Sequence, residues 1–241
     1  MDAARRRRWY PPGMLRSAIL LAVLLAACDG TEPVEARYAE SGNLRYEGRV
    51  SGVGEARRAE GEWTFRYPGG EVQAHGEFES GALPGEEALF SDHTVVPAEG
   101  REGWWTFTDT EGRLTAEGDY VLGARDDLWT TWYENGHQCC TGKFLGGLEH
   151  GYHVRWDSQG RRRDTRFYVE GRLSGPRRIL DETGQTVWSG EYADGVLISS
   201  DPPDVPAPDI HDLRSCLEGA EIGRTTPLEP DAEDFARQLA Q

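Results

Sequence analysis

The chain has 241 residues, and its 42 acidic and 26 basic side chains give a formal net charge of −16. This acidic excess excludes a binder of nucleic-acid backbones, and a mean hydropathy of −0.65 excludes a chain with several membrane-spanning helices. The 30 glycines, with 8 Trp, 9 Tyr and 7 Phe, favour a β-protein with many turns, because disordered acidic chains contain few aromatic residues.

The first segment has the order of a bacterial export signal. Basic residues at Arg5–Arg8 and Arg16 precede ten apolar residues, 18–27, a stretch that suits a signal peptide and is too short to span a bilayer. It ends in Leu-Ala-Ala-Cys28, which resembles the lipobox of bacterial lipoproteins, whose cysteine is lipidated and becomes the new N-terminus. The alternative is an ordinary signal peptide with a chance cysteine. The three features occur in the right order, which favours lipidation of Cys28.

We therefore predict a signal peptide over residues 1–27 and a tether over 28–41. Removing the signal leaves 21 basic and 41 acidic residues, a net charge of −20. The expected location is the bacterial cell envelope, where the lipid on Cys28 holds the protein to the inner or the outer membrane.

The body of the chain repeats every 24 residues. The unit is Gly-x5-Gly-x-aromatic-x2-Gly, with Arg166 in place of the second glycine of one copy. Three columns keep this spacing over four copies: Gly112, Gly136, Gly160 and Gly184; Tyr120, Phe144, Tyr168 and Tyr192; Gly123, Gly147, Gly171 and Gly195. Earlier copies begin at Gly42 and Gly70 and fit with insertions, the larger one within residues 82–104. We predict five to six copies over residues 42–195.

Each unit has the pattern of two strands joined by a glycine turn. Trp129–Tyr133 is a strand-length aromatic and β-branched stretch, Asn135-Gly136 is a turn, and 137–144 is the return strand. Alternation along the return strands gives one apolar and one polar face, as in an antiparallel sheet packed on one side. The predicted fold is all-β: an elongated, single-layer antiparallel meander. Later copies place charged residues in apolar columns, at His153, Arg162, Asp164 and Arg177; a solvated end is favoured over a binding surface.

These repeats resemble the MORN (membrane occupation and recognition nexus) family, and more closely its bacterial variant in YwqK-type proteins, some of which are labelled antitoxins. The resemblance rests on 61–70, 128–136 and the Gly-x-aromatic-x2-Gly tails. It implies an elongated, twisted sheet of stacked hairpins, usually with a partner-binding role.

Residues 196–241 form an acidic tail that begins with a proline-rich stretch. Ile210, Leu213 and Leu217 lie on one stripe of a short helix, and 231–241 is a second candidate helix. The alternatives are helices that cap the last hairpin or a disordered tail. We favour capping for the first helix and disorder for the remainder.

The cysteines and histidines are the candidates for chemistry. Cys139 and Cys140 are adjacent on a strand, so their side chains point to opposite faces. We expect Cys140 to be a small core residue, and Cys139 to lie on the polar face, where it could pair with Cys216 in an oxidising envelope; the sequence does not fix this connectivity. His137, His150 and His153 lie nearby without metal-ligand spacing.

The chain has no nucleophile motif and no phosphate-binding glycine loop, so we expect no metal, no cofactor and no enzymatic activity. The candidate partner-binding residues are aromatic: Trp63, Trp105, Trp129, Trp132 and Tyr133. The alternative, favoured by strand parity, is that these residues pack between hairpins. We expect a lipid-anchored protein-interaction scaffold. The alternatives are an antitoxin or immunity-like protein that neutralises a basic partner, and a glycan-binding or hydrolytic envelope protein.

Overall fold

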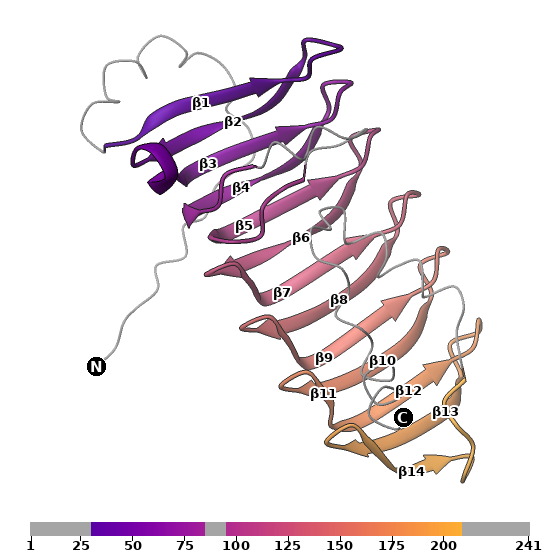
Figure 1. The fold of residues 1–241 in the computed structure, drawn as a ribbon. Coiled ribbons are helices and arrows are strands. Elements are labelled where there is room, and N and C mark those ends of the chain that lie inside the picture. Colours follow the sequence, from indigo (N-terminus) through magenta and orange to yellow (C-terminus); the bar gives the residue numbers. More distant parts are fainter. Residues whose placement is uncertain (1–29, 85–94, 209–241) are drawn as a thin grey trace, which may run out of the picture.

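A computed structural model describes residues 30–84 and 95–208 (Figure 1). The described chain forms one open sheet of 14 strands, in which every hydrogen-bonded pair is antiparallel and the strands follow one another in sequence order, except that the short β11 pairs with β10 alone and β10 pairs next with β12. The all-β, single-layer antiparallel meander is confirmed over these residues. The strands are β1 (Glu32–Arg37), β2 (Leu44–Ser51), β3 (Arg58–Arg66), β4 (Val72–Gly81), β5 (Arg101–Thr108), β6 (Leu114–Val121), β7 (Ala124–Trp132), β8 (Gln138–Leu145), β9 (Leu148–Trp156), β10 (Arg162–Val169), β11 (Arg172–Leu173), β12 (Gly175–Leu180), β13 (Thr186–Ala193) and β14 (Val196–Asp201).

The sheet is wider at both ends than the predicted repeat region. β1 lies in the segment assigned to a tether, and β14 lies in the predicted tail. β1 forms because its backbone pairs with β2 from Glu32 to Arg37, although its alternating charges gave no strand signal. The segment between β4 and β5 ends where β5 begins, at Arg101, so it lies within the range 82–104 given for the insertion. The lipidation site, Cys216 and the two tail helices lie outside the described residues.

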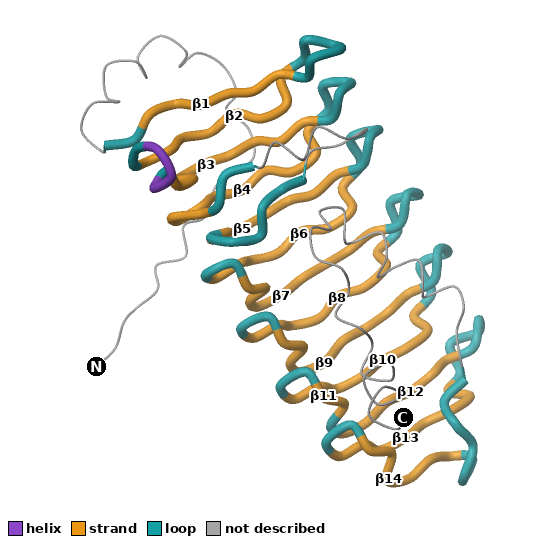
Figure 2. The backbone as a smooth tube through the Cα atoms, in the orientation of Figure 1, coloured by secondary structure: helices purple, strands orange, loops and turns teal. Residues whose placement is uncertain are grey.

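The turns lie along the two long edges of the sheet (Figure 2). Glycines of the first and third columns have positive φ, for example 81° at Gly136 and 88° at Gly147, a conformation that favours glycine. In three turns of one edge an aspartate stabilises the loop. The Asp157 Oδ1 accepts hydrogen bonds from the backbone N–H groups of Gln159 and Arg161, at 3.1 and 3.0 Å, as Asp109 and Asp181 do in their own turns.

The second column requires glycine for a different reason, which was not predicted from the sequence. Gly48, Gly76 and Gly118 lie inside strands, and a Cβ on any of them would overlap the indole ring of the next repeat's tryptophan. Each of these three tryptophans therefore lies against the glycine of the preceding return strand. Here glycine is required for space between strands.

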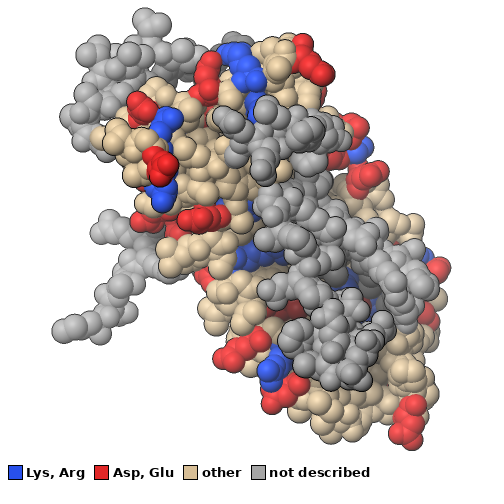
Figure 3. Space-filling view, in the orientation of Figure 1, with Lys and Arg blue, Asp and Glu red and all other residues tan. Residues whose placement is uncertain are grey.

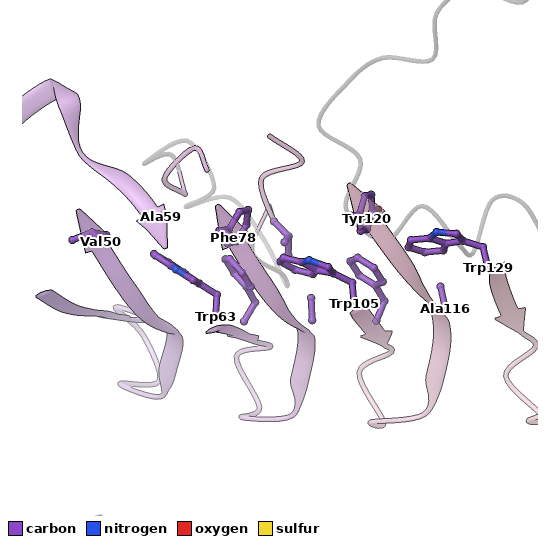
Figure 4. Packing of buried hydrophobic residues seen from close by; sticks show 12 residues of the cluster. Val50, Ala59, Trp63, Phe78, Trp105, Ala116, Tyr120 and Trp129 are labelled. Atoms are coloured by element: carbon purple, nitrogen blue, oxygen red, sulfur yellow. The ribbon is translucent and has the colours of Figure 1, made fainter. Parts of the chain in front are cut away.

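The core is a row of aromatic rings on this same face (Figure 4), which we call the tryptophan face. Edge-to-face contacts link successive repeats, such as Phe78–Trp105 and Tyr120–Trp129, with centroids 5.0 and 4.9 Å apart. Its buried members are Val50, Ala59, Trp63, Phe65, Ala74, Phe78, Val96, Trp105, Phe107, Ala116, Tyr120 and Trp129. Val96 comes from the insertion, which therefore covers part of this face.

A buried arginine fastens the insertion to the core. The Arg101 guanidinium lies over the rings of Trp105 and Tyr120 at 5.0 Å from each centroid. It donates hydrogen bonds to the Tyr120 hydroxyl at 2.6 Å and to the backbone oxygens of Val96 and Pro97 at 2.9 and 2.8 Å.

Among the residues described, no helix is long and apolar enough to cross a membrane.

Candidate partner-binding surface

Three of the five aromatic residues predicted to bind a partner are buried in the core. Trp63, Trp105 and Trp129 are 1%, 0% and 4% exposed, so their rings are not available to a partner in this structure. Their indole Nε1 groups donate to backbone oxygens of the preceding return strand, at Arg49, Glu77 and Asp119, over 3.1, 3.1 and 2.8 Å. The packing alternative, which strand parity favoured, accounts for these three residues.

Trp132 and Tyr133 are half-buried and lie where β7 enters its turn. The Tyr133 hydroxyl donates to the backbone oxygen of Trp156 at 2.9 Å. Tyr67 makes the equivalent bond to Thr108 at 2.9 Å. The tyrosine at this position therefore links its repeat to the next, which is a structural role; the repeats of Gly112, Gly160 and Gly184 have the turn aspartate in its place.

Three exposed apolar side chains lie in the neighbouring column, on the opposite face of the sheet. Trp104, Leu128 and Tyr152 recur at the 24-residue spacing on β5, β7 and β9, and are 49%, 46% and 61% exposed. Each comes one position before a residue of the tryptophan column, namely Trp105, Trp129 or His153. Because side chains alternate along a strand, each therefore points away from the tryptophan face. Two strand spacings separate successive members, about 10 Å.

Phe167 extends this series on β10. It is the direct cross-strand neighbour of Tyr152, and the two rings meet edge to face with centroids 4.9 Å apart. We call Trp104, Leu128, Tyr152 and Phe167 the apolar row. The 24-residue period together with strand parity contained the signal for it. It was missed because the buried tryptophans beside it carried the stronger aromatic pattern.

Carboxylates surround the first part of the apolar row. Asp119 is the cross-strand partner of Trp104; burial raises its pKa, and so does repulsion from Asp127, Asp126 and Glu102. Burial also raises the pKa of Glu117, on the same face of β6. Within the described parts of the chain, Glu102, Glu117, Asp119 and Asp126 make no salt bridge. Acidic side chains are also visible along the margins of the molecule in Figure 3.

In the C-terminal half of the tryptophan face, where a solvated end was expected, Arg162 is exposed, but Asp164 is buried and its arginine partners are half-buried. Asp164 is 1% exposed. Its carboxylate accepts hydrogen bonds from Arg166 at 2.7 Å and from Arg177 at 3.0 Å. In the repeats of Gly70 and Gly112 these three columns hold alanine, the second glycine and tryptophan, as at Ala116, Gly118 and Trp129. The pattern does not decay here; an ion triad replaces the apolar packing.

His153 replaces tryptophan in the preceding repeat and copies its contacts. It lies on Gly142, and its Nε2 lies 2.8 Å from the Lys143 backbone oxygen. Since a carbonyl oxygen only accepts, Nε2 carries the proton, as the indole Nε1 does elsewhere. Burial lowers the pKa of His153, and the charges of Arg155 and Arg166 lower it further, against the Lys143 carbonyl, which raises it.

The two adjacent cysteines are placed differently from the prediction. Cys139 is 1% exposed and disulfide-bonded, whereas Cys140 is half-buried and a free thiol. Strand alternation gave the directions of these side chains but not what covers each face, and Gln73 at the equivalent position is also fully buried. The other two cysteines, Cys28 and Cys216, lie outside the described residues, so pairing of Cys139 with Cys216 stays a prediction. Over residues 30–84 and 95–208, no three His, Cys, Asp or Glu side chains form a metal-binding group.

The site therefore belongs to an open hairpin sheet with an apolar row on one face. No family model and no curated protein matches the chain. Among solved structures, it aligns with one chain of "Crystal structure of GtfA/B complex bound to UDP and GlcNAc" at 13% sequence identity and a TM-score of 0.18. The alignment covers 57% of this chain and 22% of that chain. A TM-score this low supports no argument about fold or function.

Proposed function

We propose that this chain is a lipid-anchored protein of the bacterial cell envelope whose hairpin repeats bind a partner protein. The observation that carries the proposal is the apolar row, in which three side chains at least 46% exposed recur at the repeat period. Exposed apolar patches on soluble proteins mark interaction sites. Tryptophan and tyrosine are also the residues that most often dominate binding energy at protein interfaces.

The anchor rests on the N-terminal sequence. Basic residues, an apolar stretch and Cys28 occur in the order of a lipoprotein signal. β1 begins at Glu32, four residues after Cys28, so the proposed lipid would hold the first strands near the membrane. A partner of the apolar row would then also be an envelope protein.

The repeat architecture supports the proposed relationship to MORN-type proteins. The units have a 24-residue period and two strands each, and they stack into one elongated sheet. Such arrays usually present a long surface to partners.

A second function, neutralisation of a basic partner, is favoured by the carboxylates beside Trp104. Asp119 and its acidic neighbours repel one another in the free protein, and a cationic partner would relieve this repulsion. The net charge of −20 after signal removal would also accelerate encounter with such a partner.

Site-specific photo-crosslinking in the lipidated full-length protein tests the interaction. A photoreactive residue at position 104, 128 or 152 should capture the same protein in each case. Val187, which is 48% exposed on β13, is the matched control position and should not capture it. The double variant Trp104→Ala/Tyr152→Ala should reduce capture from position 128 by about tenfold or more, since truncated hot-spot residues each cost about 2 kcal/mol.

Equal capture at position 187, or capture unaffected by the double variant, would contradict the assignment of the surface. Retention on polysaccharide without a captured protein would favour a glycan-binding protein instead. If the captured protein is basic and releases in moderate salt, the neutralising function is supported, because screening weakens exposed charge pairs.

The anchor has its own test. The Cys28→Ala variant should lose incorporation of a labelled fatty acid and move from the membrane fraction to the soluble fraction. A variant that stays membrane-bound and labelled would exclude lipidation at Cys28.

A further inference from the structure

The open sheet ends in two edge strands, β1 and β14, which differ in how they are protected. Among the residues described, each pairs with one neighbour only, β1 with β2 and β14 with β13. An edge strand presents unpaired backbone N–H and C=O groups, which can pair with another strand unless something blocks them.

β1 carries the features that block such pairing. Pro33 has no backbone N–H to donate. Charged side chains fill the remaining exposed positions: Glu35 pairs with Arg37 at 3.2 Å, and Glu32 pairs with Arg57 at 2.9 Å. Pairing another strand onto β1 would require desolvating these charges.

β14 carries none of these features in its first five residues. The strand reads Val-Leu-Ile-Ser-Ser-Asp from Val196 to Asp201, without proline and without a charge before its last residue. Its three aliphatic side chains are exposed: Val196 by 62%, Leu197 by 38% and Ile198 by 63%. An apolar edge of this kind favours the addition of one more strand.

The charges around β14 select the occupant. Glu191, Asp194, Asp201 and Asp204 are all exposed at this end of the sheet. Within the described chain, their single salt bridge joins Asp194 to Arg172 at 4.0 Å. A second copy pairing edge to edge would bring two identical sets of carboxylates together, whereas a strand with basic ends would neutralise them.

We propose that β14 is a strand-addition site for a partner segment that is aliphatic at its centre and carries lysine or arginine at its ends. Backbone hydrogen bonds extend the sheet by one strand, and the partner's side chains alternate between the two faces. The site lies at the edge of the sheet and stands independently of the apolar row.

Binding of a synthetic strand peptide to the full-length protein tests this site. The probe is a short peptide of alternating valine and threonine with lysine at both ends, measured by fluorescence anisotropy. It should bind, and the same peptide with glutamate at both ends should bind about tenfold more weakly, since exposed opposite charges attract modestly and like charges repel. A lysine peptide with N-methylated backbone amides, which cannot pair as a strand, should not bind.

Two protein variants locate the site. Asp201→Lys, at the end of β14, should weaken the preference for the lysine peptide, because one of the four carboxylates is replaced by a cation. Ile198→Pro should abolish binding of both, because Ile198 lies at the bulge in the middle of β14, where proline removes a backbone N–H and disrupts pairing. The matched control is Glu35→Lys on β1, which should leave the preference unchanged.

Three results would overturn the proposal. They are equal binding of the N-methylated peptide, an unchanged preference in the Asp201→Lys variant, and dimers of the protein alone that Ile198→Pro dissociates. The last result would assign the edge to a second copy. The Asp201→Lys measurement keeps the test decisive if Ile198→Pro does not fold.

Discussion

Asp164 and its two arginines show how one repeat can replace three apolar columns at once. Removing one partner of a buried ion pair leaves the other charge buried without compensation and lowers the free energy of unfolding by about 3–5 kcal/mol. Replacing the whole set by well-packed apolar residues is often neutral or stabilising. The repeats of Gly70 and Gly112 supply the apolar alternative, which has alanine, glycine and tryptophan in these columns.

We therefore predict opposite outcomes for single and concerted substitution. Asp164→Ala alone should lower the free energy of unfolding by about 3–5 kcal/mol. Asp164→Ala/Arg166→Gly/Arg177→Trp, which restores the pattern of those two repeats, should return it to the wild-type value or above. Urea unfolding followed by circular dichroism measures both, and a triple variant as unstable as the single one would contradict the prediction.

The triad also predicts sensitivity to acid. Burial disfavours the Asp164 carboxylate, but the charges and hydrogen bonds of Arg166 and Arg177 outweigh burial and lower its pKa. Because the folded pKa lies below the unfolded value of about 3.9, the contribution is complete above that value and is lost as the pH falls through the folded pKa. The stability difference between wild type and Asp164→Asn should therefore shrink below about pH 4.

His153 predicts a second pH effect, nearer neutrality. Its pKa is lowered in the folded state, so its contribution is complete above the unfolded value of about 6.5 and is lost as the pH falls through the folded pKa. His153→Trp should keep the hydrogen bond to Lys143 and remove this loss. Measured between pH 5 and 8, the unfolding midpoints of wild type and His153→Trp should converge at the upper end of this range. A difference between them that stays constant with pH would contradict a role for His153 protonation.

At the scale of the strand, the two kinds of glycine predict different costs. Gly118→Ala inserts a Cβ into the Trp129 ring and should cost about 3 kcal/mol, as overpacking does. Gly136→Ala meets no atom within 4 Å but keeps φ at 81°, and should cost about 1 kcal/mol. In a double-mutant cycle, Gly118→Ala/Trp129→Ala should cost less than the sum of its parts. Additive values would show that the ring is not what excludes the Cβ.

The hairpins could be predicted because their signals are local, whereas the proposed binding surface was missed although the repeat period and strand parity contained its signal. A turn glycine and an alternating strand lie within a few residues of each other, so the period and the antiparallel order followed from the sequence. The glycine beneath Trp129 and the arginines around Asp164 depend on contacts between strands. Trp104 and Trp105 are adjacent and were interpreted together as one aromatic pattern. Only the alternation of side chains along a strand assigns them to opposite faces.

For the whole molecule, a linear array predicts that one unit can be removed. Deleting residues 124–147 joins Gly123 to Leu148 in the same turn register and places His153 over Gly118, as it now lies over Gly142. The shortened protein also loses Cys139, yet should fold cooperatively with a lower midpoint, because stability in such arrays is a sum over neighbours. The control deletion, 124–135, removes half a unit and should not fold cooperatively. If both deletions behave alike, the 24-residue unit is not the folding unit.

The tryptophan-on-glycine contact also determines the order in which the repeats can complete their packing as the chain emerges. Each glycine strand is covered by a ring that lies later in the chain, so during synthesis or export a unit stays uncovered until the next one has emerged. Folding should then trail the emerging chain by one repeat. The series closes at Gly190, which is covered instead by Trp188 of its own strand and by Leu197, so the last unit is completed without a tryptophan still to come.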